Sequence, residues 1–192
     1  MIQTLIGNRG LLALCGILDA VVAAIYLLMQ DTSGPVTFHS WNGPIALMGK
    51  LIIAAGVCTI AAGLWKSATG RVWLLVVNGS ALFVLGLIHY AFARYRVSFL
   101  TVAVLIVLMA ISLGMLELAI ARIFRLSHRT GEACVVGICG IVAFGFVVPF
   151  LLLGLRWIAV KPGSHPDLLW LAFFFMFSTL SMFGLATRLG TN

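Results

Sequence analysis

The fold is decided by long apolar stretches such as FLTVAVLIVLMAISLGMLELAIA, residues 99–121, in which Glu117 is the single ionisable side chain. At about 1.5 Å per residue, a helix of this length crosses a bilayer core about 30 Å thick. The stretch lacks the polar–apolar alternation of a membrane barrel strand, and an open strand would leave its backbone groups unpaired in lipid. It therefore predicts a transmembrane helix.

The whole chain has the composition of a protein that resides in lipid. Of its 192 residues, 62% are hydrophobic and 9% are charged, whereas soluble domains carry about 25% charged residues. We therefore expect an all-α membrane protein that forms one domain, residues 1–192, of three helical hairpins in a bundle. The predicted spans are residues 10–29, 45–65, 72–92, 99–121, 133–155 and 168–189.

Helix breakers and charges set the predicted boundaries. Residues 30–44 are predicted to form a loop because they contain breakers that include Pro35 and Pro44. Arg122 and Arg125 are predicted to end the fourth span after Ala121, and Pro149 is predicted to kink the fifth.

Lysine and arginine are distributed unevenly between the two sides of the predicted bundle. The side with both termini carries the larger share, which by the positive-inside rule places both termini in the cytoplasm. The net charge of +7 then reflects inner loops and anionic headgroups, and we expect no nucleic-acid partner. The residues on this side are Arg9, Lys66, Arg71, Arg122, Arg125, Arg129 and Arg188.

Motifs for catalysis or metal binding are missing from the sequence. All four cysteines lie in apolar stretches without ligand spacing, and no hydrolase, metalloprotease or phosphate-binding motif occurs. We expect neither an enzyme nor a cofactor or metal. The expected partner is the lipid bilayer, together with a second copy of the chain or other membrane proteins.

Five glycines repeat every seven residues on two neighbouring spans. Seven residues nearly complete two helical turns, so each set lines one face. Small residues let helices approach closely in lipid, and the alternative is that the glycines line a pore or substrate path. They are Gly49, Gly56 and Gly63 in the second span and Gly79 and Gly86 in the third.

Ionisable and polar side chains within a span are costly in lipid and are functional candidates for that reason. Asp19 lies about 15 Å beyond Arg9 along its helix, and Lys50 enters the second span from the other side with a stem that can reach toward Asp19. Glu117 and Asn78 have similar depths and can form a hydrogen bond between helices. Structural pairing and a proton-carrying carboxyl are the alternatives.

Histidines form a second candidate group at the outer side. His39 and His165 fall in predicted loops, and His89 lies near the outer end of its span. With Asp31 and Asp167 they would gain charge below about pH 6.5, as an acid sensor requires. The alternative is that they are unrelated surface histidines.

The end of the fourth span and the start of the fifth resemble the HdeD family (the DUF308 repeat). The resemblance rests on LGMLELAIAR, residues 113–122, and on VGICGIVAFG, residues 136–145, and the spans and short inner links fit over most of the chain. It implies a bacterial inner-membrane protein of six spans, of a family whose founding member is linked to acid resistance. It carries over no catalytic residue.

Two functions follow as hypotheses. The first is a non-enzymatic inner-membrane protein of the HdeD type that supports acid or envelope stress resistance. The second is a small proton-coupled transporter or channel that uses Asp19, Lys50 and Glu117 within the membrane.

Overall fold

The computed structural model describes residues 6–30, 38–65, 72–92, 99–155 and 166–188. These residues form helices and short turns, with six helical spans long and apolar enough to cross a membrane. The predicted all-α, six-span membrane fold is confirmed. The helices are α2 (Arg9–Gln30), α3 (Phe38–Leu64), α4 (Trp73–Phe92), α5 (Phe99–Leu126), α6 (Thr130–Gly145), α7 (Val147–Gly154) and α8 (Pro166–Arg188).

Two boundaries expected from helix breakers and charges are wrong, although the membrane span within α3, Ile45–Leu64, begins where it was predicted. Helix α3 begins at Phe38, inside the expected loop, because a proline such as Pro44 removes one backbone hydrogen bond and does not always end a helix. Helix α5 continues past Arg122 to Leu126. Arginine is a good helix former, so a charge marks where the membrane ends and not where the helix ends.

The fifth span is broken into α6 and α7 at Phe146. Pro149 lies three residues further on and has no N–H to donate to the carbonyl of Gly145. The kink expected from Pro149 is therefore present, and it begins just before the proline.

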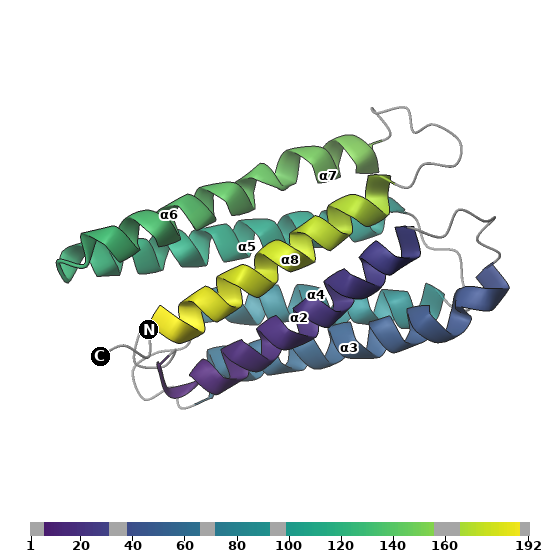
Figure 1. The fold of residues 1–192 in the computed structure, drawn as a ribbon, viewed down its shortest axis with the longest axis horizontal. Coiled ribbons are helices and arrows are strands. Elements are labelled where there is room, and N and C mark those ends of the chain that lie inside the picture. Colours follow the sequence, from purple (N-terminus) through teal and green to yellow (C-terminus); the bar gives the residue numbers. More distant parts are fainter. Residues whose placement is uncertain (1–5, 31–37, 66–71, 93–98, 156–165, 189–192) are drawn as a thin grey trace.

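The helices form an elongated bundle in which neighbours run nearly along its long axis (Figure 1). The most extensive contacts join α3 with α4, α2 with α8, and α5 with α6. The first span thus pairs most closely with the last one, and not with the second as in a hairpin of successive spans. Helix α8 makes few contacts with α6 and α7.

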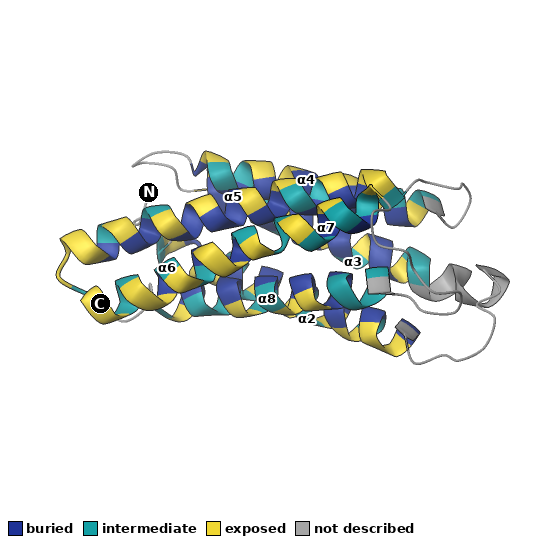
Figure 2. Cartoon of the chain, turned by 90° about the horizontal axis from the view of Figure 1, so that it is seen from above, coloured by how far each residue is buried: buried dark blue, intermediate teal, exposed yellow. Residues whose placement is uncertain are grey.

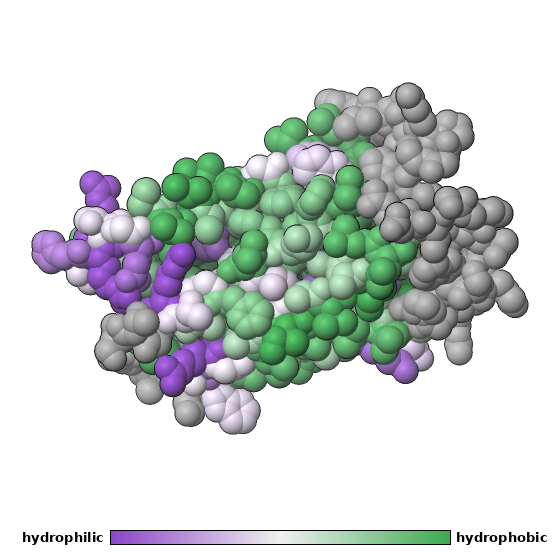
Figure 3. Space-filling view, viewed as in Figure 1, coloured by the Kyte–Doolittle hydropathy of each residue, from purple (hydrophilic) through white to green (hydrophobic). Residues whose placement is uncertain are grey.

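Five arginines lie at one end of the bundle, which we call the basic end. Helices α2 and α6 begin there, and α5 and α8 end there (Figure 1). Hydrophilic residues gather at this end of the space-filling view, whereas apolar residues cover the middle (Figure 3). The described arginines of this end are Arg9, Arg122, Arg125, Arg129 and Arg188.

Each helix turns its buried face inward and an exposed face outward (Figure 2), and many of the exposed side chains are large and apolar. The α6–α7 span is the least covered: 22% of an 18-residue window within it is buried, against 39–50% in the other spans. Outward-facing side chains such as Ile138, Ile141 and Val148 are more than half exposed. Such a surface is suited to contact with lipid, where apolar exposure is not costly.

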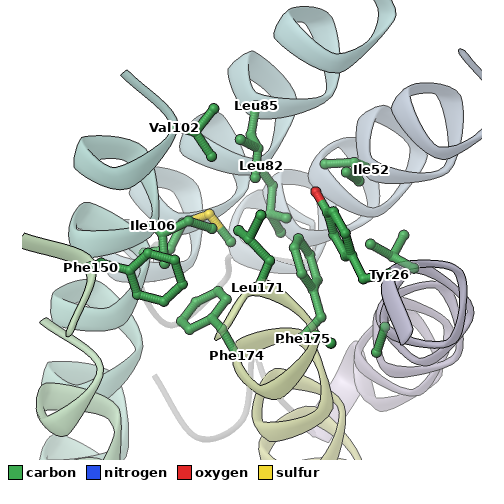
Figure 4. Close-up of a cluster of buried hydrophobic side chains, with 14 of the residues drawn as sticks. Tyr26, Ile52, Leu82, Leu85, Val102, Ile106, Phe150, Leu171, Phe174 and Phe175 are labelled. Carbon is green, nitrogen blue, oxygen red and sulfur yellow. The ribbon is translucent and has the colours of Figure 1, made fainter. Parts of the chain in front are cut away.

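The core consists of two separate apolar clusters stacked along the bundle axis. The far cluster lies away from the basic end, where the rings of Tyr26, Phe150, Phe174 and Phe175 point into the space between the helices (Figure 4). The basic cluster lies nearer the arginines and includes Leu12, Leu75, Leu116, Ile120 and Met182.

The seven-residue glycine sets lie where α3 and α4 approach most closely. A Cβ atom on Gly56 would stand 2.6 Å from the backbone nitrogen of Phe83, and one on Gly49 would stand 2.7 Å from that of Tyr90. A Cβ on Gly79 or Gly86 would meet the backbone of α3 at similar distances, and one on Gly63 would meet the carbonyl oxygen of Val72 at 3.0 Å. This geometry supports packing as the role of the glycines.

Candidate functional site

A layer of buried polar side chains separates the two apolar clusters. On α2, Asp19 lies between Cys15 of the basic cluster and Val22 of the far cluster. On α3, α4, α5 and α8 a buried polar residue likewise lies between residues of the two clusters. The polar side chains therefore share one level of the bundle. They are Asp19, Thr59, Asn78, Ser112, Ser178 and Ser181, and we call them the polar layer.

Asp19 is held by a serine of the last helix. The Ser178 hydroxyl donates a hydrogen bond to Asp19 Oδ2 over 2.6 Å, and only 1% of Asp19 is exposed. The second oxygen, Oδ1, has no hydrogen-bond partner. This contact belongs to the closely packed α2–α8 pair.

Glu117 repeats this arrangement one turn nearer the basic end. The Ser181 hydroxyl donates to Glu117 Oε1, while Oε2 has no hydrogen-bond partner and the residue is 1% exposed. Because Ser178 and Ser181 are three residues apart, they lie on the same face of α8. One helix face therefore bonds carboxyl groups from both α2 and α5.

The remaining hydroxyl groups of the layer bond carbonyl oxygens of their own helices, and one amide oxygen lacks a partner. Thr59 donates to the carbonyl oxygen of Ala55 over 2.8 Å, and Ser112 donates to that of Met109 over 3.0 Å. Asn78 is 2% exposed, and its Oδ1 has no hydrogen-bond partner. Two carboxyl groups and one amide thus offer unused acceptors inside the bundle.

A tyrosine–histidine pair lies further along α2, on the far side of the polar layer. Tyr26 Oη and His89 Nε2 are 2.6 Å apart, and His89 Nδ1 is 2.9 Å from the carbonyl oxygen of Leu85. A carbonyl can only accept, so Nδ1 carries the hydrogen and Tyr26 donates to Nε2 of the neutral ring. Tyr26 follows Asp19 by seven residues and therefore lies on the same face of α2.

The structure does not bring Lys50 to Asp19, so the expected approach is wrong. Lys50 is exposed on α3, whereas Asp19 is enclosed between α2 and α8. Lys50 follows Gly49, which faces α4, and a step of about 100° around the helix turns the lysine away. Within the described part of the chain, Asp19 forms no ion pair.

The hydrogen bond expected between Glu117 and Asn78 is also absent. Glu117 bonds Ser181 on α8 through Oε1, and the free acceptors of Glu117 and Asn78 both lack donors. The similar depth of Glu117 and Asn78 in the membrane did not identify their partners, because depth does not determine toward which neighbouring helix a side chain points.

His89 does not belong to the outward-facing histidine group in which it was expected. This residue is 7% exposed and is bonded within the bundle to Tyr26 and Leu85. His39 falls in the first turn of α3, where the structure describes the backbone but not the side chain, and His165 lies outside the described residues. In the described ranges, no three His, Cys, Asp or Glu side chains are arranged to hold a metal ion.

The sequence interpretation missed Ser178, Ser181 and Tyr26. The available signal was the spacing of the two serines, which places them on one face of an otherwise apolar span. Such serines commonly bond their own helix backbone, as Thr179 does to Phe175 over 2.9 Å.

Comparison with protein-family models, curated proteins and solved structures finds no match to the chain. The fold and the site therefore define the class of protein. It is a multi-pass, all-helical membrane protein with two buried carboxyl groups bonded to one face of its last helix.

Proposed function

We propose that the chain is a non-enzymatic bacterial inner-membrane protein that carries protons on Asp19 and Glu117, as a small proton-coupled transporter or channel. One observation supports this most directly. Both carboxyl groups are buried, both accept from serines one turn apart on α8, and both keep one oxygen without a hydrogen-bond partner.

A buried carboxyl of this kind is suited to bind and release a proton. An ionised carboxylate in lipid is costly unless a cation or enough donors surround it. The unused oxygens of Asp19 and Glu117 are the atoms on which a proton would reside. A serine hydroxyl both donates and accepts, so Ser178 and Ser181 can bond either form of their carboxyl groups.

The buried groups are spaced along the membrane normal in a way that supports a relay. Ser178 and Ser181 are separated by about 4.5 Å along α8, and Asp19 and Tyr26 by about 10.5 Å along α2. These steps are longer than one hydrogen bond, so transfer requires water or helix motion between them. The apolar clusters close both sides of the polar layer, which fits an occluded state with its site near the midplane.

Proton flux into liposomes tests the proposal. The purified full chain is reconstituted around a pH-sensitive dye, and flux is recorded after an acid step with the membrane potential clamped. We expect Asp19→Asn and Glu117→Gln to lower the flux at least tenfold. The matched control is Glu132→Gln, because Glu132 is paired with Arg129 at the basic end. Equal flux in all three variants, or no flux in the native chain, contradicts the proposal.

The second candidate function is a non-enzymatic HdeD-type component that supports acid or envelope stress resistance. It is favoured by the packing of the stretches that carry the resemblance. A Cβ on Gly114 would lie 2.9 Å from the Gly140 carbonyl oxygen, so these glycines serve helix contact. Survival at low pH that depends on the chain, without any measurable flux, supports this function over transport.

A further inference from the structure

The hairpin formed by α5 and α6 opens toward the basic end. At its closest point, a Cβ on Gly140 would lie 3.0 Å from the carbonyl oxygen of Gly114. One turn nearer the basic end, a Cβ on Gly137 would meet the Cβ of Ala121 at 3.8 Å, an ordinary contact. The two helices therefore diverge toward their connecting turn.

This divergence leaves a pocket of about 400 Å³ between the helices. The volume lies within the range of roughly 300–1,000 Å³ that is usual for ligand sites. Two arginines and a threonine supply its polar wall, and small apolar side chains and a thiol supply the rest. The lining residues are Ala121, Arg122, Arg125, Thr130, Ala133 and Cys134.

The positive charge of this pocket is not neutralised within the described part of the chain. Arg122 and Arg125 are exposed and form no ion pair there. Glu132, which follows Thr130 of the pocket by two residues, is paired with Arg129, which donates two hydrogen bonds of 2.9 and 2.6 Å to its Oε1. The anion that balances the two arginines must therefore come from outside these residues.

The other acidic residues of the described ranges lie away from the pocket. The chain has five in total. Asp19 and Glu117 are buried in the bundle, Asp167 lies in the first turn of α8 at the far end, and Asp31 follows α2 outside the described residues.

The pocket lies at the level where hydrocarbon meets water. Arg122 and Arg125 belong to the last turns of the span that ends at Leu126, and Thr130 is the first residue of the next span. Lipid phosphates occupy this level, and basic pockets between helices bind anionic headgroups. Beyond Cys134, the exposed side chains of α6 are apolar and include Val135, Ile138 and Ile141.

We propose that this pocket binds the phosphate headgroup of an anionic membrane lipid. Arg122 and Arg125 contact the phosphate oxygens, and the Thr130 hydroxyl donates a hydrogen bond to them. An acyl chain lies along the exposed apolar face of α6. That face distinguishes a lipid from free phosphate, which has no apolar part to place there.

Lipid binding by the detergent-solubilised full chain tests this proposal. Native mass spectrometry counts bound phosphatidylglycerol and, as the zwitterionic comparison, phosphatidylcholine with the same acyl chains. We expect the double substitution Arg122→Gln and Arg125→Gln to weaken phosphatidylglycerol binding by roughly ten- to thirtyfold, at about three- to fivefold per arginine. The matched control, Arg9→Gln, removes a charge from the same end on α2 and is expected to change binding less than twofold.

A second measurement leaves the charge unchanged. Ala133→Leu fills the pocket and is expected to weaken phosphatidylglycerol binding as well. Cys134 is exposed at the pocket wall, so bound phosphatidylglycerol is expected to slow its alkylation by a maleimide, and Arg9→Gln is expected to keep this protection. Equal losses in the pocket and Arg9 variants, displacement by millimolar inorganic phosphate, or unprotected Cys134 overturn the proposal.

Discussion

One of the closest helix contacts in the bundle makes Gly56→Ala the most informative stability test. A Cβ at this position would lie 2.6 Å from the Phe83 nitrogen and 2.8 Å from the Gly79 carbonyl oxygen. Ordinary contact begins at 3.4 Å, so α3 and α4 must separate locally by about 0.8 Å. Both obstacles are backbone atoms, and no side-chain rotation can relieve the contact.

The expected cost follows from two opposing effects. Overpacking a close contact costs about 1–3 kcal/mol, and backbone obstacles place this case at the upper end. Replacing glycine by alanine within a helix stabilises the folded state by about 1 kcal/mol through helix propensity. We therefore expect Gly56→Ala to lower the free energy of unfolding by about 2 kcal/mol.

Reversible unfolding in mixed micelles, followed by circular dichroism, measures this change. The matched control is Gly184→Ala in α8, where an added Cβ would meet no atom within 4 Å. The control is expected to be neutral or more stable by up to about 1 kcal/mol. Equal stability of the Gly56→Ala variant and the native chain would refute the inferred contact between α3 and α4.

Three further changes test the site. Ser178→Ala removes the hydrogen bond to Asp19 and is expected to lower the free energy of unfolding by about 0.6–1.7 kcal/mol in the same assay. The Ser127 hydroxyl bonds only its own helix backbone, so Ser127→Ala is expected to lower it by less. Tyr26→Phe removes the donor to His89 and is expected to shift the Nε2 resonance of that ring in nitrogen NMR, and an unchanged spectrum would argue against the bond. Lys50→Met is expected to leave proton flux within twofold of the native value because the lysine is exposed. A tenfold loss of flux would show that Lys50 takes part in proton transfer.

The spans could be predicted from the sequence because lipid demands long apolar helices. The predicted start of the fourth span, Phe99, agrees with the start of α5. The predicted end of this span does not agree with the end of α5, because hydropathy changes at Arg122 while the backbone hydrogen bonds of the helix continue. The starting point of α3 could not be predicted from Pro44 for a related reason, because a local breaker signal does not reveal the contacts that extend a helix.

The buried carboxyl groups could also be found from the sequence, but their partners could not. Counting residues placed Asp19 deep in its span, and the residue is indeed buried. The choice of Lys50 failed because a hydropathy pattern in a uniformly apolar span does not reveal which face turns inward. Ser178 became a partner only through the pairing of the first span with the last, which is a property of the whole bundle.

Proton binding by the buried carboxyl groups is measured most directly by infrared difference spectroscopy of the chain in liposomes across a pH step. The account predicts that a carboxylic acid C=O band grows on acidification. Asp19→Asn and Glu117→Gln are each expected to remove a part of this band, and Glu132→Gln is expected to leave both of these parts in place. A difference spectrum unchanged by Asp19→Asn and Glu117→Gln would contradict the account.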